Sequence, residues 1–102
     1  MFKKLVISIV ALASVLVTAE TLDRFIHVNR MFSEGISTAG FYPVENLPEC
    51  KWGLMYIDLA TESGRAIFSL ALTAKIASHS VVRVDYTVDT SGKCRVTGFH
   101  TQ

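Results

Sequence analysis

The sequence has little net charge and no clustered charge of one sign. Its 102 residues hold 10 Lys and Arg against 9 Asp and Glu, which leaves a formal net charge of +1. A nucleic-acid binder normally presents a basic patch that replaces the counterions of the phosphates. The arginines are scattered along the chain, so we do not expect nucleic acid as a partner. They lie at Arg24, Arg30, Arg65, Arg83 and Arg95.

Spacings typical of catalytic and metal sites are also missing. His27, His79 and His100 lie far apart, and neither a C-x-x-C pair nor a G-x-S-x-G turn occurs. Asp58 and Glu62 are close in sequence, but they flank the start of a predicted helix, where capping and the helix dipole account for them. We therefore predict that the protein is not an enzyme and uses no metal or cofactor.

The amino-terminal residues have the three-part layout of a secretory signal peptide. Lys3 and Lys4 precede an apolar block over residues 5–17, and small residues up to Ala19 come before the acidic Glu20. The block is shorter than the roughly 20 apolar residues that span a bilayer, and no later uncharged stretch is long enough to serve as an anchor.

We predict a signal peptide over residues 1–19 and a single mature domain over residues 20–102. Cleavage would leave an exported protein, periplasmic or secreted, without a membrane anchor, and would lower the formal charge from +1 to −1 because two lysines are lost. An uncleaved amino-terminal anchor is the alternative.

Cysteine is scarce, and Cys50 and Cys94 are the only two. An even number of cysteines in a small exported domain predicts a disulfide. Such a bond would stabilise the domain by up to about 4 kcal/mol in the chain-entropy model. A redox or metal pair would need closer spacing or additional ligands.

The pattern of apolar residues predicts five strands and one helix in the order β-β-β-α-β-β. Period-two alternation and β-branched residues indicate the strands, a turn at 31–35 separates the first two, and Thr61 or Ser63 can cap the helix. Five strands with one helix favour a closed or partly open barrel, and the OB-fold is the leading candidate. The predicted strands cover residues 22–30, 36–44, 50–59, 81–88 and 93–101, and the predicted helix covers residues 62–78.

The predicted helix has a wider apolar surface than one end of a barrel should need. Phe68, Leu72 and Ile76 extend the apolar arc beyond the face that would pack on the strands. Two explanations stand. Loops or the segment before the first strand cover these side chains, or they form an oligomer interface in a ring of identical subunits.

Several segments carry a resemblance to a known family. Cys50, residues 55–61, 64–75 and 82–86, and Cys94 resemble small exported bacterial proteins related to the subtilase cytotoxin and pertussis-type toxin B subunits. The resemblance implies an OB-fold, assembly as rings of five and binding of cell-surface glycans. This chain is shorter than those subunits and has fewer cysteines.

Ligand-binding candidates come partly from this resemblance. The tripeptide 31–33 echoes a sequence near a glycan-contacting serine of the subtilase toxin's B subunit, which makes Ser33 a candidate. Phe41 and Tyr42 are candidates because they lie beside Pro43 at a strand end, whereas Trp52 and Tyr56 are expected in the core.

The predicted function is therefore a non-catalytic binding module that binds glycans and forms a ring. The alternative is a monomeric exported protein with a structural or inhibitory role that binds another protein.

Overall fold

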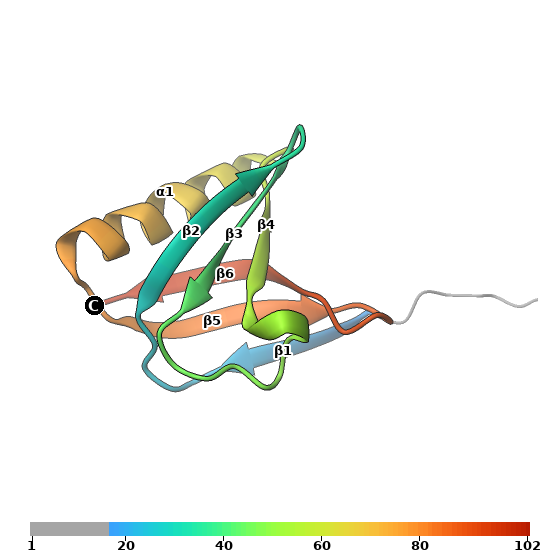
Figure 1. Ribbon diagram of the computed structural model, residues 1–102, viewed down its shortest axis with the longest axis horizontal. Coiled ribbons are helices and arrows are strands. Elements are labelled where there is room, and N and C mark those ends of the chain that lie inside the picture. The colour runs from blue at the N-terminus through green and yellow to red at the C-terminus, as the bar shows by residue number, and fades with distance from the viewer. Residues whose placement is uncertain (1–16) are drawn as a thin grey trace, which may run out of the picture.

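The computed structural model describes residues 17–102 as a six-stranded sheet with one α-helix (Figure 1). The predicted signal peptide lies mostly outside these residues. A short 3-10 helix, η1, joins the third and fourth strands. The elements are β1 (Thr18–Leu22), β2 (Val28–Glu34), β3 (Thr38–Pro43), η1 (Lys51–Gly53), β4 (Met55–Asp58), α1 (Glu62–Ala77), β5 (Val81–Val88) and β6 (Cys94–Thr101).

The sheet has the order β1-β5-β6-β4-β3-β2, and only β4 and β6 run parallel. It is strongly curved but not closed, since β1 and β2 are its edges. One isolated backbone bridge joins the link between β1 and β2 to the first residue of β5: the Ile26 N–H donates to the carbonyl of Val81 at 2.9 Å, and the Val81 N–H donates to the carbonyl of Ile26 at 2.8 Å. The predicted five-stranded barrel is thus replaced by an open sheet of six strands.

The extra strand arises because the predicted strand 22–30 is divided. Its start belongs to β1 and pairs with β5, whereas its end belongs to β2 and pairs with β3. A strand that pairs with neighbours at opposite ends of a sheet must bend, and the ladder is interrupted between Leu22 and Val28. The turn predicted at 31–35 begins later than expected, because β2 continues to Glu34. The hairpin turns at Gly35, whose φ is +64°, as the sequence indicated.

The third predicted strand is shorter than expected. Of residues 50–59, only Met55–Asp58 form a strand, while Lys51–Gly53 form η1. Trp52 and Gly53 both adopt positive φ, of 62° and 68°. Two consecutive left-handed residues end the extended conformation, which period-two alternation alone does not reveal.

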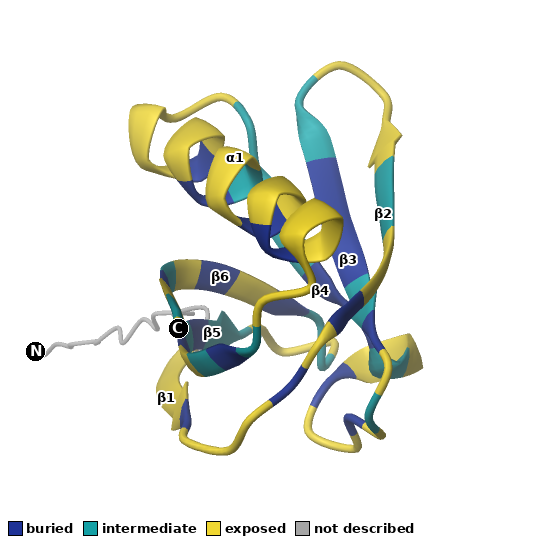
Figure 2. Ribbon diagram, turned by 90° about the vertical axis from the view of Figure 1, so that its left-hand side faces the viewer, coloured by how far each residue is buried: buried dark blue, intermediate teal, exposed yellow. Residues whose placement is uncertain are grey.

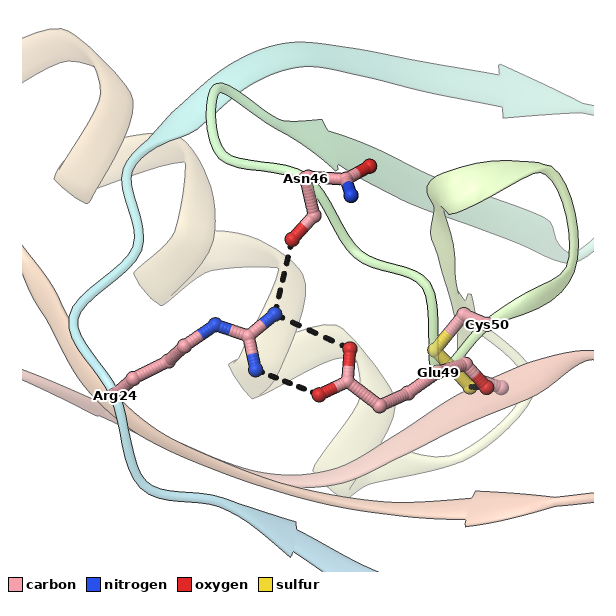
Figure 3. A network of polar contacts seen from close by, with 5 residues as sticks. Arg24, Asn46, Glu49 and Cys50 are labelled. Carbon is pink, nitrogen blue, oxygen red and sulfur yellow. Dashed lines mark hydrogen bonds and ion pairs between the residues drawn. A yellow bond between two sulfur atoms is a disulfide. The ribbon is translucent and has the colours of Figure 1, made fainter.

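The predicted disulfide between Cys50 and Cys94 is present, with a Cα–Cα distance of 5.4 Å. It ties the segment before η1 to the first residue of β6. An ion pair supports the same region: Arg24 donates to both carboxylate oxygens of Glu49 at 2.6 and 3.1 Å, and to the carbonyl of Asn46 at 2.9 Å (Figure 3). The link between β1 and β2 is thereby fastened to the loop that carries the disulfide.

Helix α1 begins as the sequence predicts. Thr61 accepts a hydrogen bond from the Gly64 backbone N–H at 2.9 Å and so caps the helix. Its buried face is narrow and consists of small residues except for Ile67. Gly64 approaches the end of β4 so closely that a Cβ there would lie 1.7 Å from the carbonyl oxygen of Asp58. Figure 2 shows the buried positions of α1 on the side that faces the strands. They are Gly64, Ile67, Ala71 and Ala74.

The core lies between α1 and the concave inner face of the sheet. Phe41 is fully buried there, and its ring centroid is 5.7 Å from that of Phe99. Met55 and Ile57 of β4 point to the same side, so their neighbours Tyr56 and Asp58 point to the opposite, outer face. The outer face is therefore available for function.

Candidate ligand-binding face

Three aromatic rings form a row across the outer face of the sheet. Phe32 of β2 lies between the other two, with its centroid 5.7 Å from Tyr42 of β3 and 5.9 Å from Tyr56 of β4. Gly40 makes this possible, because a Cβ there would lie 2.6 Å from the Phe32 ring and 2.3 Å from the carbonyl oxygen of Met55. The missing side chain lets Phe32 lie across β3.

Trp52 stands beside this row in an unfavourable backbone conformation. Its φ of 62° is in the left-handed region, which costs a residue with a Cβ about 1–2 kcal/mol. Trp52 remains 61% exposed, so the free energy gained by burying its side chain offsets little of that cost. An exposed tryptophan on a strained backbone is typical of a residue kept for binding.

Cationic side chains lie over these aromatic rings. Arg30 lies over the Tyr42 ring, with its guanidinium carbon 4.2 Å from the centroid. The Lys93 ammonium is 5.7 Å from the Trp52 centroid and 5.9 Å from the Tyr56 centroid, so it connects the two rings. The Lys51 ammonium is 4.8 Å from the Trp52 centroid. We call this set the aromatic-cation row; it comprises Arg30, Phe32, Tyr42, Lys51, Trp52, Tyr56 and Lys93.

A pocket of about 450 Å³ opens at the Tyr56 end of the row. Arg95 and Asp58 form a long ion pair across it, with 3.5 Å between Nη1 and Oδ2, while Asp58 Oδ1 accepts from the Ala60 backbone N–H at 2.9 Å. Partial burial raises the pKa of Tyr56, with a further contribution from Glu34, so its hydroxyl stays protonated and can donate. The polar lining residues are Ser37, Thr38, Tyr56, Asp58, Lys93 and Arg95.

The predicted ligand residues do not meet in one place. Tyr42 belongs to the aromatic-cation row. Phe41 is fully buried in the core, where its ring cannot touch a ligand at the surface. Ser33 is exposed on β2, but it pairs with the inward-facing Ala39, so it lies on the opposite side of the sheet from Tyr42.

The expectation that Trp52 and Tyr56 lie in the core was wrong. Trp52 leaves the strand pattern because η1 replaces the first part of the predicted strand, and Tyr56 is half-buried on the outer face. Gly53, directly after Trp52, was the one sequence signal that could have indicated a break in the strand.

The predicted oligomer-interface residues differ in exposure. Phe68 packs against the core and is half-buried, whereas Leu72 is 38% exposed and Ile76 is 76% exposed. Within residues 17–102, no loop covers Leu72 and Ile76.

Two other kinds of feature, a metal cluster and a membrane-spanning helix, are absent from the part of the chain that the structure describes. It contains no group of three or more His, Cys, Asp or Glu side chains placed to hold a metal ion. Within residues 17–102, no helix has the length and apolar character needed to cross a membrane. No protein-family model, curated protein or solved structure matches the chain.

Proposed function

We propose that this protein is an exported module that binds glycans at a non-catalytic site, formed by the aromatic-cation row and the adjoining pocket. The observation that carries the proposal is the exposed Trp52 on a left-handed backbone, joined to Tyr56 by Lys93. A side chain that adds strain and gains little burial does not serve stability.

The chemistry of the row suits a sugar. The apolar faces of pyranose rings stack on aromatic rings, and sugar hydroxyls exchange hydrogen bonds with the carboxylate, guanidinium and hydroxyl groups that line the pocket. The positive charges of Lys93 and Arg95 favour a sugar that carries a carboxylate over a neutral one.

The strand order supports an OB-type fold for this module. If β1 and β2 are taken as two halves of one bent strand, the order becomes that of a five-stranded barrel with β4 and β6 parallel and the helix between the third and fourth strands. The Ile26–Val81 bridge lies where such a barrel would close. An OB-type topology is what the resemblance to toxin B subunits implies.

Export remains part of the proposal. Cleavage after Ala19 would fall inside β1, which pairs Ala19 with Thr87 and Glu20 with Tyr86. A mature chain that starts at Glu20 would keep three of the five residues of β1, including the buried Leu22. The amino-terminal sequence of protein recovered from the periplasm or the medium tests the cleavage site.

A glycan array with the purified exported protein tests the binding function. We expect wild-type protein to bind a subset of glycans, and Trp52→Ala and Lys93→Ala to bind the same glycans at least about tenfold more weakly. Phe25→Ala is the matched control, because Phe25 is 57% exposed and lies outside the row. Binding that survives Trp52→Ala would contradict the proposed site.

Ring formation would use the uncovered side of α1. Leu72 and Ile76 are the side chains that would pack between copies. The mass in solution tests this: we expect an oligomer that Leu72→Lys dissociates without unfolding the domain. A wild-type protein that sediments as a monomer at high concentration would rule the ring out.

The alternative function, a monomeric structural or inhibitory protein that binds another exported protein, rests on other exposed apolar side chains. Ile36 at the tip of the β2–β3 hairpin is fully exposed, and Val44 is 64% exposed. Failure on glycans, together with co-purification of one exported protein that Ile36→Ser releases, would favour this alternative.

A further inference from the structure

Away from the aromatic-cation row, three polar side chains from distant segments form a continuous hydrogen-bonded chain. Ser80 Oγ lies 3.2 Å from His27 Nε2, and His27 Nδ1 lies 2.6 Å from Glu45 Oε2. His27 belongs to the link between β1 and β2, Glu45 to the loop after β3, and Ser80 to the link between α1 and β5.

Backbone hydrogen bonds hold these three segments together. The Ile26–Val81 bridge sets the residues next to His27 and Ser80 opposite each other. The His27 carbonyl accepts from Val44 N–H at 2.8 Å, and the His27 N–H donates to Glu45 Oε1 at 2.7 Å. The relative positions of the three side chains therefore follow from the fold.

The ionisation of Glu45 and the tautomer of His27 follow from their hydrogen-bond partners. Burial pushes the pKa of Glu45 up, but the hydrogen bonds from the His27 ring and backbone outweigh it, so the pKa is lowered and Glu45 is a carboxylate at neutral pH. A carboxylate only accepts, so neutral His27 carries its proton on Nδ1. Its Nε2 lone pair then faces Ser80, whose hydroxyl donates to it.

We infer that Ser80, His27 and Glu45 form a Ser-His-Glu relay that makes Ser80 Oγ a nucleophile toward small esters. The same order of groups, with the carboxylate orienting the imidazole and the imidazole taking the serine proton, activates serine in hydrolases on unrelated folds. The relay was not visible in the sequence, because its members are separated by two long intervals and no nucleophile-elbow motif surrounds Ser80.

The reaction balances without any other reagent. Ser80 Oγ attacks the ester carbonyl carbon as its proton passes to His27 Nε2, and collapse of the tetrahedral intermediate expels the alcohol, which takes that proton. Water then attacks the acyl-serine, gives a proton to Nε2 and releases the acid, and the proton returns to Ser80 Oγ.

The surroundings of the relay limit the substrate. The side chains of His27 and Glu45 are 47% and 32% exposed, so the site is open and suits a small ester that needs no deep cleft. Within residues 17–102, the backbone N–H of Ser80 donates to no backbone acceptor, so it can stabilise the developing oxyanion as the nucleophile's own N–H does in serine proteases.

Labelling of the full-length purified protein with a fluorophosphonate probe, followed by peptide mapping, tests the relay. Ser91 is an internal control, because its hydroxyl donates to Asp89 at 2.7 Å and has no imidazole partner. We expect Ser80 to be labelled roughly 100-fold faster than Ser91, the low end of the contribution of a positioned general base. Equal labelling of the two serines in the folded wild-type protein would overturn the inference.

Single-residue variants test the role of each member of the relay. Ser80→Ala should abolish the fast labelling and the hydrolysis of p-nitrophenyl acetate, and His27→Gln should slow labelling of Ser80 to the rate of Ser91. Glu45→Gln should give an intermediate rate, and the thermal unfolding of each variant checks that the fold is retained. Fast labelling of Ser80 in His27→Gln would contradict the relay, and none of these outcomes depends on glycan binding.

Discussion

Alternate residues of the same strands form the two faces of the sheet, but the two faces differ in burial and in side-chain chemistry. Along β4, Met55 and Ile57 are buried beneath α1, whereas Tyr56 and Asp58 point outward to the aromatic-cation row and the pocket. The inner face gains burial, while the outer face holds exposed rings, cations and the strained backbone of Trp52. If the proposed function holds, stability and binding depend on alternate residues of one short strand, and variants on the two faces should separate the two properties.

The largest effect is expected on the inner face. Phe41→Ala removes a fully buried ring that packs against Phe99, and we expect a loss of about 4 kcal/mol in the free energy of unfolding. Urea denaturation followed by circular dichroism measures it. A loss below about 1 kcal/mol would mean that Phe41 is not part of a close-packed core.

The disulfide comes next, because it fastens the segment before η1 to the inner face. The double variant Cys50→Ala with Cys94→Ala should lower the free energy of unfolding by about 3 kcal/mol. Wild-type protein measured with and without reducing agent is the control. If reduction leaves the urea midpoint unchanged, the bond does not constrain the unfolded chain as we argue.

The third effect is expected at Gly40, where the Phe32 ring packs closely against the backbone of the sheet. Gly40→Ala should cost about 2 kcal/mol, because the new methyl meets both the Phe32 ring and the Met55 carbonyl. The double variant with Phe32→Ala separates the two obstacles. We expect it to stay destabilised, since the carbonyl is backbone; full recovery would show that only the ring matters.

The Arg24–Glu49 ion pair is half-exposed, so Glu49→Gln should cost about 1 kcal/mol or less at pH 7. The hydrogen bond from Arg24 lowers the pKa of Glu49 in the folded protein, against the effect of burial. Between the folded and unfolded pKa values the unfolded chain binds more protons, so this contribution is complete above about pH 4.3 and is lost as pH falls through the folded pKa.

Urea titrations of wild type and Glu49→Gln at several pH values measure this dependence. The difference between them should shrink at acid pH. Glu34→Gln is the control, because Glu34 forms no ion pair within residues 17–102. A difference that does not change with pH would show that the charge on Glu49 does not contribute.

The smallest change in stability is expected at Trp52. Glycine adopts positive φ freely, so Trp52→Gly should change the free energy of unfolding by less than about 1 kcal/mol while removing glycan binding. Parallel denaturation and binding measurements check both parts. A large loss of stability would show that Trp52 is a structural residue, which would contradict the division of stability and binding between the two faces.

Local pattern predicted the second half of the fold well. The β-branched run of β5 matches the predicted strand 81–88, and the capped helix ends one residue before the predicted 62–78. These elements depend on neighbours in sequence: the Thr61 cap, helix periodicity and β-branched side chains. The pairing of Cys50 with Cys94 was predictable too, because no other cysteine competes.

Sequence-based prediction failed where one segment pairs with two different strands, and where residues from several segments come together in one site. Residues 22–30 show the period-two alternation of a single strand. The start of this segment nevertheless pairs with β5 and its end with β3, so the break is visible only in the complete sheet. The aromatic-cation row draws Phe32, Tyr42, Tyr56 and Lys93 from four parts of the chain, so the sequence indicated only Tyr42.

Local sequence was enough to specify the mainly β composition, the one helix with its cap and the disulfide, because each depends on local backbone preference or on the presence of only two cysteines. Tertiary structure alone decided that the sheet is open, that Trp52 is exposed and that Ser80, His27 and Glu45 meet. Those features depend on hydrogen bonds between residues that are remote in sequence, and no local pattern encodes which remote partners will pair.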